Sequence, residues 1–228
     1  MKMLPKAILV SILGVAASSG LVGQTAFAEA ADSTAPSAAN PTRPHIVTIG
    51  DSIMAGYGLA SPDQAWPALE AADEHVDVTN LACSGAGFVR VGDCGTDFNG
   101  LVGQAVAAHP DLVVIQASDN DQGQSAAAIA RGAWRTVARI HGALPDARIV
   151  GLSTLWNQPG PADPVVAESS DALQAAVTAA GGTFVDVGQP LAGQPQLLQG
   201  DSEHPTVEGQ RVLGDAIADD LAAAGISN

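Results

Sequence analysis

The sequence predicts an α/β protein of three layers (α/β/α), with a five-stranded parallel sheet between two layers of helices. Two observations carry this prediction. Short apolar runs rich in Val, Ile and Leu recur along the chain at 45–49, 76–81, 112–117, 148–153 and 183–187. Helix-like stretches separate these runs. Near-continuous apolar strands that alternate with helices are typical of a parallel sheet covered on both faces.

The helix-like stretches lie near 63–73, 100–108, 123–143, 164–181 and 206–224. The last one shows the pattern most clearly, because Val212, Ile217 and Leu221 are apolar while aspartates occupy the other faces. The long stretch at 123–143 contains Trp134, which we expect in the core. In such a sheet, functional side chains are expected on loops outside the carboxyl ends of the strands.

The first 28 residues have the features of a secretory signal peptide. Lys2 and Lys6 give a positive start, an apolar stretch follows, and Ala-Phe-Ala at 26–28 provides a small-x-small cleavage site. Cleavage after Ala30 and an uncleaved N-terminal anchor are the alternatives. We therefore expect a secreted, extracellular protein.

The mature chain divides into two parts by composition. Residues 29–43 are rich in Ala, Ser, Pro and Thr without periodicity, which predicts a disordered leader. Residues 44–228 remain, and a length of about 185 residues suits one α/β domain with a proper core.

The mature chain is strongly acidic. Both lysines precede residue 29, so seven arginines stand against 24 acidic residues, a net charge of −17. This balance argues against nucleic acid or an anionic membrane surface as partner. No other stretch is long and apolar enough for stable membrane insertion, and we expect a monomer. A solvated acidic face accounts for the charge without any particular substrate.

The two cysteines, Cys83 and Cys94, flank a glycine-rich segment. In an oxidising compartment a pair at this spacing most simply forms a disulfide that closes a short loop. Two unrelated buried thiols are the alternative. Two cysteines without a neighbouring histidine are too few for a zinc site.

A serine, a histidine and a carboxylate stand at positions suited to acyl transfer. The strand at 45–49 runs directly into Gly-Asp-Ser, which places Ser52 on a tight turn. Asp201 and His204 lie three positions apart near the C-terminus. Such groups supply the nucleophile, the orienting carboxylate and the base. Glu203 is also close to the histidine, but adjacent side chains on extended backbone point apart, which favours Asp201.

Two further motifs complete a family pattern. NLACSGAG at 80–87 follows the second predicted strand and SDND at 118–121 follows the third. With GDSIMAGYGL at 50–59 and DSEH at 201–204, they resemble the SGNH/GDSL hydrolase family, particularly its arylesterase and lysophospholipase branch. The resemblance implies the flavodoxin-like SGNH hydrolase fold and a catalytic triad of Ser52, Asp201 and His204.

The resemblance also implies an oxyanion hole formed by Ser52, Gly85 and Asn120. Taken alone, Gly87 would rank equally with Gly85, and Asn120 would fit an ordinary turn. The third motif usually begins with Gly, and this chain has Ser118 there. A small residue is kept, so we expect the turn to survive.

Other polar and aromatic residues fit supporting roles. Asp121 is expected to brace its loop rather than react, and Trp156, after the fourth strand, to form a wall of the substrate pocket. The segment 119–123 is superficially similar to a calcium loop, but its Gly is misplaced and no closing Glu follows. We expect no metal and no cofactor.

The resulting hypothesis is a secreted serine esterase that forms an acyl-enzyme on Ser52. Its partner would be a small-molecule, lipid or acylated-glycan ester, with short acyl or acetyl groups favoured. An O-acyltransferase acting on extracellular glycans is the catalytic alternative. A catalytically silent carbohydrate-binding domain on the same scaffold is the non-catalytic one.

Overall fold

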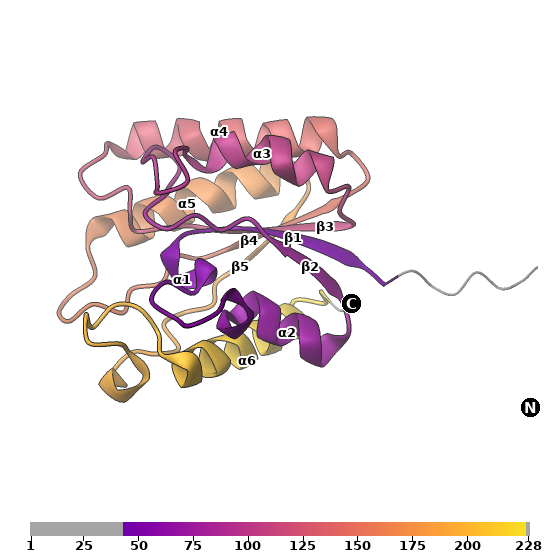
Figure 1. Cartoon of the computed structure of the whole chain (residues 1–228). Helices are drawn as coiled ribbons and strands as arrows, with labels where there is room; N and C mark the ends of the chain where they lie inside the picture. The colour runs from indigo at the N-terminus through magenta and orange to yellow at the C-terminus, as the bar shows by residue number, and fades with distance from the viewer. Residues whose placement is uncertain (1–42, 227–228) are drawn as a thin grey trace, which may run out of the picture. The chain divides into compact units, whose positions relative to one another are not determined.

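The computed structural model describes residues 43–226 and contains a single five-stranded sheet in that range (Figure 1). Its strands are β1 (His45–Ile49), β2 (Asp77–Asn80), β3 (Leu112–Gln116), β4 (Arg148–Leu152) and β5 (Thr183–Val185). Every neighbouring pair is parallel, in the order β2-β1-β3-β4-β5. The predicted five-stranded parallel sheet is therefore confirmed.

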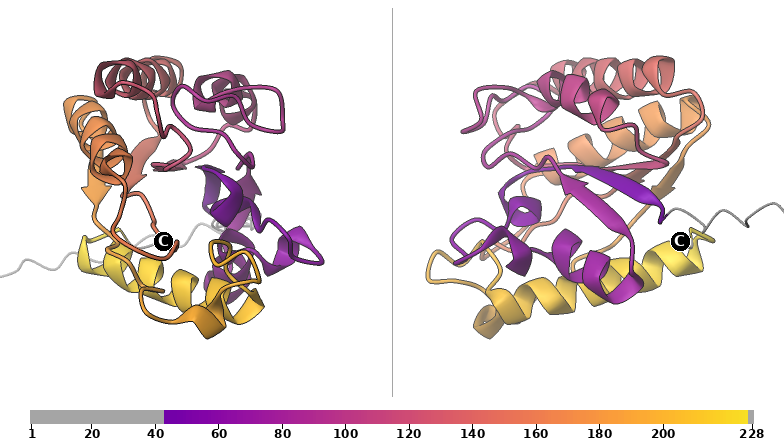
Figure 2. Two further views of the ribbon diagram at one scale, coloured as in Figure 1. Left: turned by 90° about the vertical axis from the view of Figure 1, so that its left-hand side faces the viewer. Right: turned by 45° about the vertical axis from the view of Figure 1, so that its right-hand side comes forward.

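Helices cover both faces of the sheet (Figures 1 and 2). One layer contains α3 (Phe98–Ala107), α4 (Ala126–Ala143) and α5 (Pro164–Ala179). The other contains α2 (Trp66–Glu74) and α6 (Val207–Ala223). A short helix, α1 (Ser52–Ala55), and two 3-10 turns, Pro62–Gln64 and Pro195–Leu197, lie in the connections. The architecture is the predicted three-layer α/β/α sandwich.

Local polar contacts fix where the helices begin. The side chains of Asp97, Ser125, Asp163 and Thr206 each accept a hydrogen bond from a backbone N–H in the first turn of α3, α4, α5 and α6. Such N-caps satisfy donors that have no partner within the helix. Ser125 therefore explains why α4 begins at 126 instead of at the predicted 123.

The core forms on both faces of the sheet because successive strand residues point to opposite sides. In β1 and β3, Val47 and Val113 pack in the cluster that includes the α3–α4–α5 layer. Their neighbours Ile46 and Val114 pack in the cluster that includes α2 and α6. Burial on both faces explains why these strands read as continuous apolar runs.

The prediction that Trp134 is a core residue is wrong. Its side chain is 48% exposed on α4. The buried face of this helix is formed by Ile129, Gly132, Ala133, Thr136, Val137 and Ile140. At about 100° per residue, position 134 lies outside that stripe. Helical spacing therefore overrides the general tendency of a large aromatic side chain to be buried.

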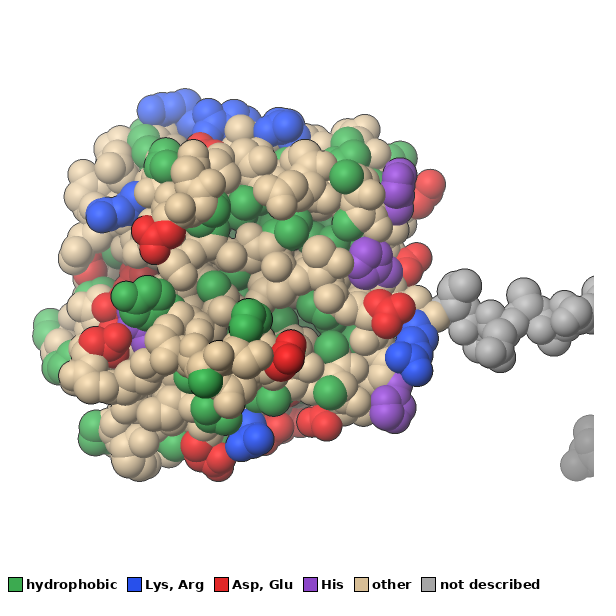
Figure 3. Space-filling model, viewed as in Figure 1, with side chains coloured by type: hydrophobic (Ala, Val, Ile, Leu, Met, Phe, Trp, Pro, Cys, Tyr) green, Lys and Arg blue, Asp and Glu red, His purple; other side chains and the backbone are tan. Residues whose placement is uncertain are grey.

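Charges are distributed unevenly over the molecule. Arg131, Arg135 and Arg139 are exposed on α4, and Figure 3 shows basic side chains gathered on that side. Carboxylates are concentrated on the opposite layer, on α2 and α6, at Glu70, Asp73, Glu74, Asp215, Asp219 and Asp220. The arginines of α4 thus face away from this cluster of carboxylates, while further carboxylates are spread over the connecting loops and α5.

The predicted signal peptide and nearly all of the predicted leader lie outside the described residues. Within residues 43–226, no helix has the length and apolar character needed to cross a membrane.

Candidate active site

The proposed nucleophile lies on a turn fixed by its neighbours. Ser52 follows β1, is 8% exposed and begins α1. The Asp51 side chain caps this helix by accepting a hydrogen bond from Ile53 N at 3.0 Å. A Cβ atom at Gly50 would lie 2.6 Å from the Met54 sulfur, so any larger residue there would have to displace the buried Met54 side chain. The motif therefore presents the serine at the carboxyl end of the sheet.

Ser52, His204 and Asp201 form a continuous hydrogen-bonded relay. His204 Nε2 lies 2.9 Å from Ser52 Oγ. His204 Nδ1 lies 2.8 Å from Asp201 Oδ2. An ionised carboxylate only accepts hydrogen bonds, so Nδ1 is the protonated nitrogen and Nε2 is free to accept from the serine hydroxyl. This arrangement can transfer the serine proton to the imidazole.

The carboxylate of this relay is held by its own loop. Asp201 Oδ1 accepts hydrogen bonds from the backbone N–H groups of Glu203 and His204, both at 3.0 Å. Partial burial raises the pKa of Asp201, but hydrogen bonds from the His204 side chain and from both backbone groups outweigh it and lower the pKa to about 2. Asp201 is therefore ionised at neutral pH, and it is Asp201 rather than Glu203 that contacts the imidazole.

The second and third motifs meet beside the relay. Gly85 has a φ of +76°, a conformation that favours glycine. The carboxamide of Asn120 donates to the carbonyl of the next residue, Ala86, at 3.1 Å. A Cβ atom at Gly87 would instead lie 2.6 Å from the Asp121 carboxylate, so that glycine serves packing. The geometry brings Gly85 and Asn120 together as the family resemblance implies.

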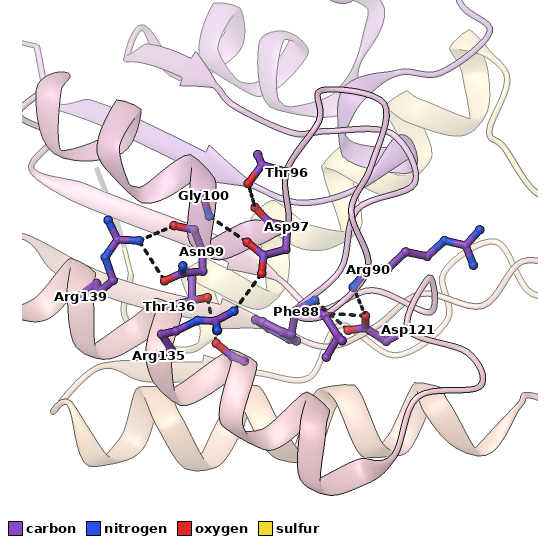
Figure 4. A network of polar contacts seen from close by, with 12 residues as sticks. Phe88, Arg90, Thr96, Asp97, Asn99, Gly100, Asp121, Arg135, Thr136 and Arg139 are labelled. Atoms are coloured by element: carbon purple, nitrogen blue, oxygen red, sulfur yellow. Dashed lines mark hydrogen bonds and ion pairs between the residues drawn. The ribbon is translucent and has the colours of Figure 1, made fainter.

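Asp121 organises the loop between these motifs, as predicted. Its buried carboxylate accepts hydrogen bonds from the backbone N–H groups of Phe88, Val89 and Arg90 at 2.7, 3.0 and 2.8 Å (Figure 4). These three backbone N–H groups bond to both carboxylate oxygens of Asp121. Asp121 therefore holds the segment that follows Gly85 and has no free oxygen directed at the relay.

Cys83 and Cys94 form a disulfide across the same segment. The two arms of this loop are also joined by a backbone hydrogen bond, which Asp93 N donates to the carbonyl of Ser84 at 2.8 Å. The bridge and this backbone bond therefore tie Cys83 and Ser84, the two residues before Gly85, to the returning arm of the loop.

The segment that follows the disulfide loop, at the start of α3, is anchored to α4. Asp97 accepts from Gly100 N at 3.0 Å and pairs with Arg135 at 2.8 Å (Figure 4). Arg139 donates to the backbone carbonyl of Asn99 at 2.7 Å. These contacts connect the loop that carries Gly85 to a long, well-packed helix.

The predicted pocket-wall residue Trp156 lies on the loop after β4. Its backbone N–H donates to Gln189 Oε1 at 2.6 Å, and the ring is partly buried. The next residue, Asn157, donates to the carbonyl of Glu203 at 3.0 Å. The Trp156 loop therefore lies against the loop that carries His204, and the wall role stays a prediction.

Two residues near the relay were missed from the sequence. The Tyr57 ring lies 4.6 Å from the His204 ring, centroid to centroid, and its side chain is 51% exposed. Burial, together with the charges of Asp51 and Glu203, raises the pKa of Asp119 to about 7. No spacing rule marks either residue, because both acquire their setting from loops that meet only in the folded chain.

Between residues 43 and 226, no cluster of three or more His, Cys, Asp or Glu side chains is arranged to hold a metal ion. The chemistry that the site can perform with its own groups is general-base-assisted attack by the Ser52 hydroxyl.

Solved structures of similar fold include enzymes that act on acyl groups. TesA superposes with a TM-score of 0.62 at 24% identity, covering 78% of this chain and 98% of that one. The psychrotrophic esterase EstA of Pseudoalteromonas sp. gives 0.62 at 19% identity, covering 81% and 100%. The salicylyl-acyltransferase SsfX3 of a tetracycline biosynthetic pathway gives 0.65 at 22% identity, covering 82% of this chain but only 56% of its own.

These similarities show the fold, and a sequence comparison gives the family. No curated protein sequence matches the chain closely. The sequence profile of the GDSL-like lipase/acylhydrolase family, however, matches residues 48–212, which include Ser52, Gly85, Asn120, Asp201 and His204. The chain therefore belongs to the GDSL-like lipase/acylhydrolase family.

Proposed function

We propose that the protein is a secreted serine ester hydrolase that forms an acyl-enzyme on Ser52. The observation that carries the proposal is the relay, in which His204 lies within hydrogen-bond distance of both Ser52 Oγ and Asp201 Oδ2. The signal-like residues 1–28 and the disulfide support export to an oxidising compartment.

The first half-reaction acylates the serine. His204 Nε2 takes the hydroxyl proton as Ser52 Oγ bonds to the ester carbonyl carbon, and the carbonyl oxygen becomes an oxyanion. The backbone N–H groups of Ser52 and Gly85 and the carboxamide of Asn120 are the proposed donors to that oxygen. The C–O bond then breaks, and the alcohol leaves with the proton from His204.

The second half-reaction releases the acid. Water gives its proton to His204 Nε2 and attacks the acyl carbon through a second oxyanion. Ser52 leaves and takes the proton back, which restores the free enzyme. Asp201, ionised throughout, holds Nδ1 and stabilises the imidazolium in both halves.

A short acyl group, such as acetyl, fits the surface around the relay. Among residues 43–226 the exposed large hydrophobic side chains are Tyr57, Val91 and Trp134, and the ring of Tyr57 lies against that of His204. A long acyl chain would need a more extended apolar surface. The alcohol portion would lie against the loops of Tyr57 and Trp156.

The test measures hydrolysis of p-nitrophenyl acetate, butyrate, octanoate and palmitate, and, in a parallel assay, deacetylation of an acetylated xylan. We expect kcat/KM to fall as the acyl chain lengthens, and the Ser52→Ala variant to be inactive on every substrate. A kcat/KM that is highest for the palmitate ester would contradict the short-chain assignment. Full activity of Ser52→Ala would contradict the acyl-enzyme.

Acyl transfer is the second candidate, favoured by the similarity to the salicylyl-acyltransferase. In that reaction a sugar or other alcohol replaces water in the second half-reaction. Product analysis of p-nitrophenyl acetate turnover in the presence of 1 M methanol or a glycan separates the two. If most of the acetyl group is transferred to the alcohol as a new ester, the protein is a transferase. If most of it is released as acetate, the protein is a hydrolase.

A further inference from the structure

Ser118 is a fully buried polar residue at the carboxyl end of β3 (0% exposed). It stands where the third motif of the related hydrolases usually has glycine. Glycine would place no polar atom at this point, so the hydroxyl is a feature of this chain. A buried hydroxyl is costly unless its hydrogen bonds are made, which directs attention to its partners.

The Ser118 hydroxyl accepts two hydrogen bonds from Asn120. One comes from the backbone N–H at 3.1 Å and the other from the side-chain nitrogen Nδ2 at 2.9 Å. The second hydrogen on Nδ2 is donated to the carbonyl of Ala86 at 3.1 Å. The carboxamide is thus held between Ser118 and the residue that follows Gly85.

The same hydroxyl also influences the carboxyl of Asp51, which precedes the nucleophile. Its proton is not used in the two bonds from Asn120 and is available to the Asp51 carboxyl. Burial raises the pKa of Asp51, and the hydrogen bond from Ser118 is the largest of the influences that lower it. Asp51 in turn caps α1 through Ile53 N at 3.0 Å.

We propose that Ser118 is a positioning residue that fixes the Asn120 carboxamide relative to the Gly85 segment. The hydrogen bonds run from the Ser118 hydroxyl to Asn120 Nδ2, and from there to the carbonyl of Ala86, beside Gly85. Two of the proposed oxyanion donors, Asn120 and Gly85, are therefore held next to each other by bonds that begin at this hydroxyl group. This inference rests on the proposed function, in which Asn120 donates to the oxyanion.

The physical reason is preorganisation. An oxyanion donor stabilises the transition state only if it is already directed at the position where charge develops. A hydrogen bond to an anion is roughly twice as strong as one between neutral groups, so the oxyanion can share an N–H of Asn120 that the neutral acceptors hold in place. Loss of the hydroxyl leaves the carboxamide present but free to rotate. We therefore expect loosening of the donor to cost less than its removal, which lowers kcat by roughly 10²–10³-fold.

The experiment is a double-mutant cycle between Ser118→Ala and Asn120→Ala, with kcat and KM measured on p-nitrophenyl acetate well below the melting temperatures. We expect Ser118→Ala to lower kcat about tenfold with KM within twofold. In the Asn120→Ala background, the same change should alter kcat less than twofold, because its effect passes through the carboxamide. Ser118→Gly should behave like Ser118→Ala, and it serves if the alanine variant does not fold.

Ser169→Ala is the matched control. Ser169 is also a fully buried serine, but it lies on α5 and its hydroxyl has no hydrogen-bond partner in the described part of the chain. We expect it to leave kcat unchanged. An equal loss from Ser118→Ala in both backgrounds would show a general structural effect and overturn the proposal.

Two other results would also overturn it. An unchanged kcat in Ser118→Ala would show that the hydroxyl is not needed, and a raised kcat that it competes with the oxyanion for the carboxamide. Failure of the proposed function has a different signature: Asn120→Ala alone would keep full kcat, or Ser52→Ala would remain active.

Discussion

His204 Nε2 lies 2.9 Å from Ser52 Oγ, although 152 positions separate the two residues in the chain. The contact exists because the serine lies on the turn that follows β1, while the histidine lies on the loop that leads into α6. The Ser52 hydroxyl needs His204 to take its proton, and in the acylation step His204 acts as a base on that hydroxyl.

Loss of either partner should cost as much as loss of both. We expect Ser52→Ala and His204→Ala each to lower kcat by at least roughly 10⁴-fold, and the double variant to lose little more, because the residues act as a unit. Steady-state kinetics on p-nitrophenyl acetate measure all three. Multiplying losses would show that the two residues contribute independently.

Asn120→Ala should affect the chemical step and leave substrate binding intact. If Asn120 donates to the oxyanion, kcat falls by roughly 10²–10³ while KM changes little. The kcat and KM values of the variant separate the two effects. A raised KM with kcat preserved would reassign Asn120 to ground-state binding of the substrate.

The disulfide should stabilise the protein and also support activity. Cys83 and Cys94 are 11 positions apart, and closing a loop of this size is worth roughly 2–3 kcal/mol in the chain-entropy account. That corresponds to a fall of roughly 5–10 °C in the melting temperature of the double Cys→Ser variant. The loop also holds Ser84, the neighbour of Gly85, through a backbone hydrogen bond from Asp93. We therefore expect kcat to be lower in the double variant even when that variant is folded.

Two measurements separate these roles of the disulfide. Intact-mass analysis after alkylation without reductant should show no free thiol in the native protein. Thermal melting and kcat of the double variant are then compared at 15 °C. A lower melting temperature with unchanged kcat would show that the bridge serves stability alone.

Glu70 should make the protein less stable as the pH rises. Burial, followed by the charges of Asp215, Asp73, Glu74 and Asp219, raises its pKa from the ordinary 4.5 to about 7. Between these values the native protein keeps a proton that the unfolded chain has released. The free energy of unfolding therefore falls as the pH rises through this window, with no further loss from Glu70 above about pH 7.

The Glu70→Gln variant tests this relationship. At pH 8 we expect a gain of about 1 kcal/mol after allowing for solvent screening, or roughly 2–4 °C in melting temperature. At pH 4 the gain should vanish. Asp171→Asn, which removes an exposed carboxylate on α5, controls for the change in net charge. A gain of equal size at both pH values would contradict the shifted titration.

The fold was predictable because its strands are buried on both faces. Continuous apolar runs such as the one in β3 are visible without any tertiary information. Helix starts were less certain, since they depend on single capping side chains such as Ser125. Trp134 shows a different failure, in which residue type was given more weight than the helical spacing that places it outside the buried stripe.

The site was only partly predictable for a related reason. Ser52, Gly85, Asn120 and the Asp201–His204 pair occur in recognisable motifs, each on a loop near the same edge of the sheet. Tyr57 and Asp119 lie within two of these motifs, but no role was predicted for either residue. Tyr57 contacts His204 because the loop after α1 meets the loop before α6, and Asp119 acquires its raised pKa from burial beside Asp51 and Glu203. Contacts between distant loops leave no periodic trace in the sequence.

The most direct test of the central claim is covalent labelling by a serine-directed organophosphonate, followed by peptide mapping. We expect one phosphonyl group per molecule, located on Ser52, with activity lost in proportion to labelling. The His204→Ala variant should be labelled far more slowly, because its serine has no base. Labelling of another serine, or full activity after complete labelling of Ser52, would contradict the account.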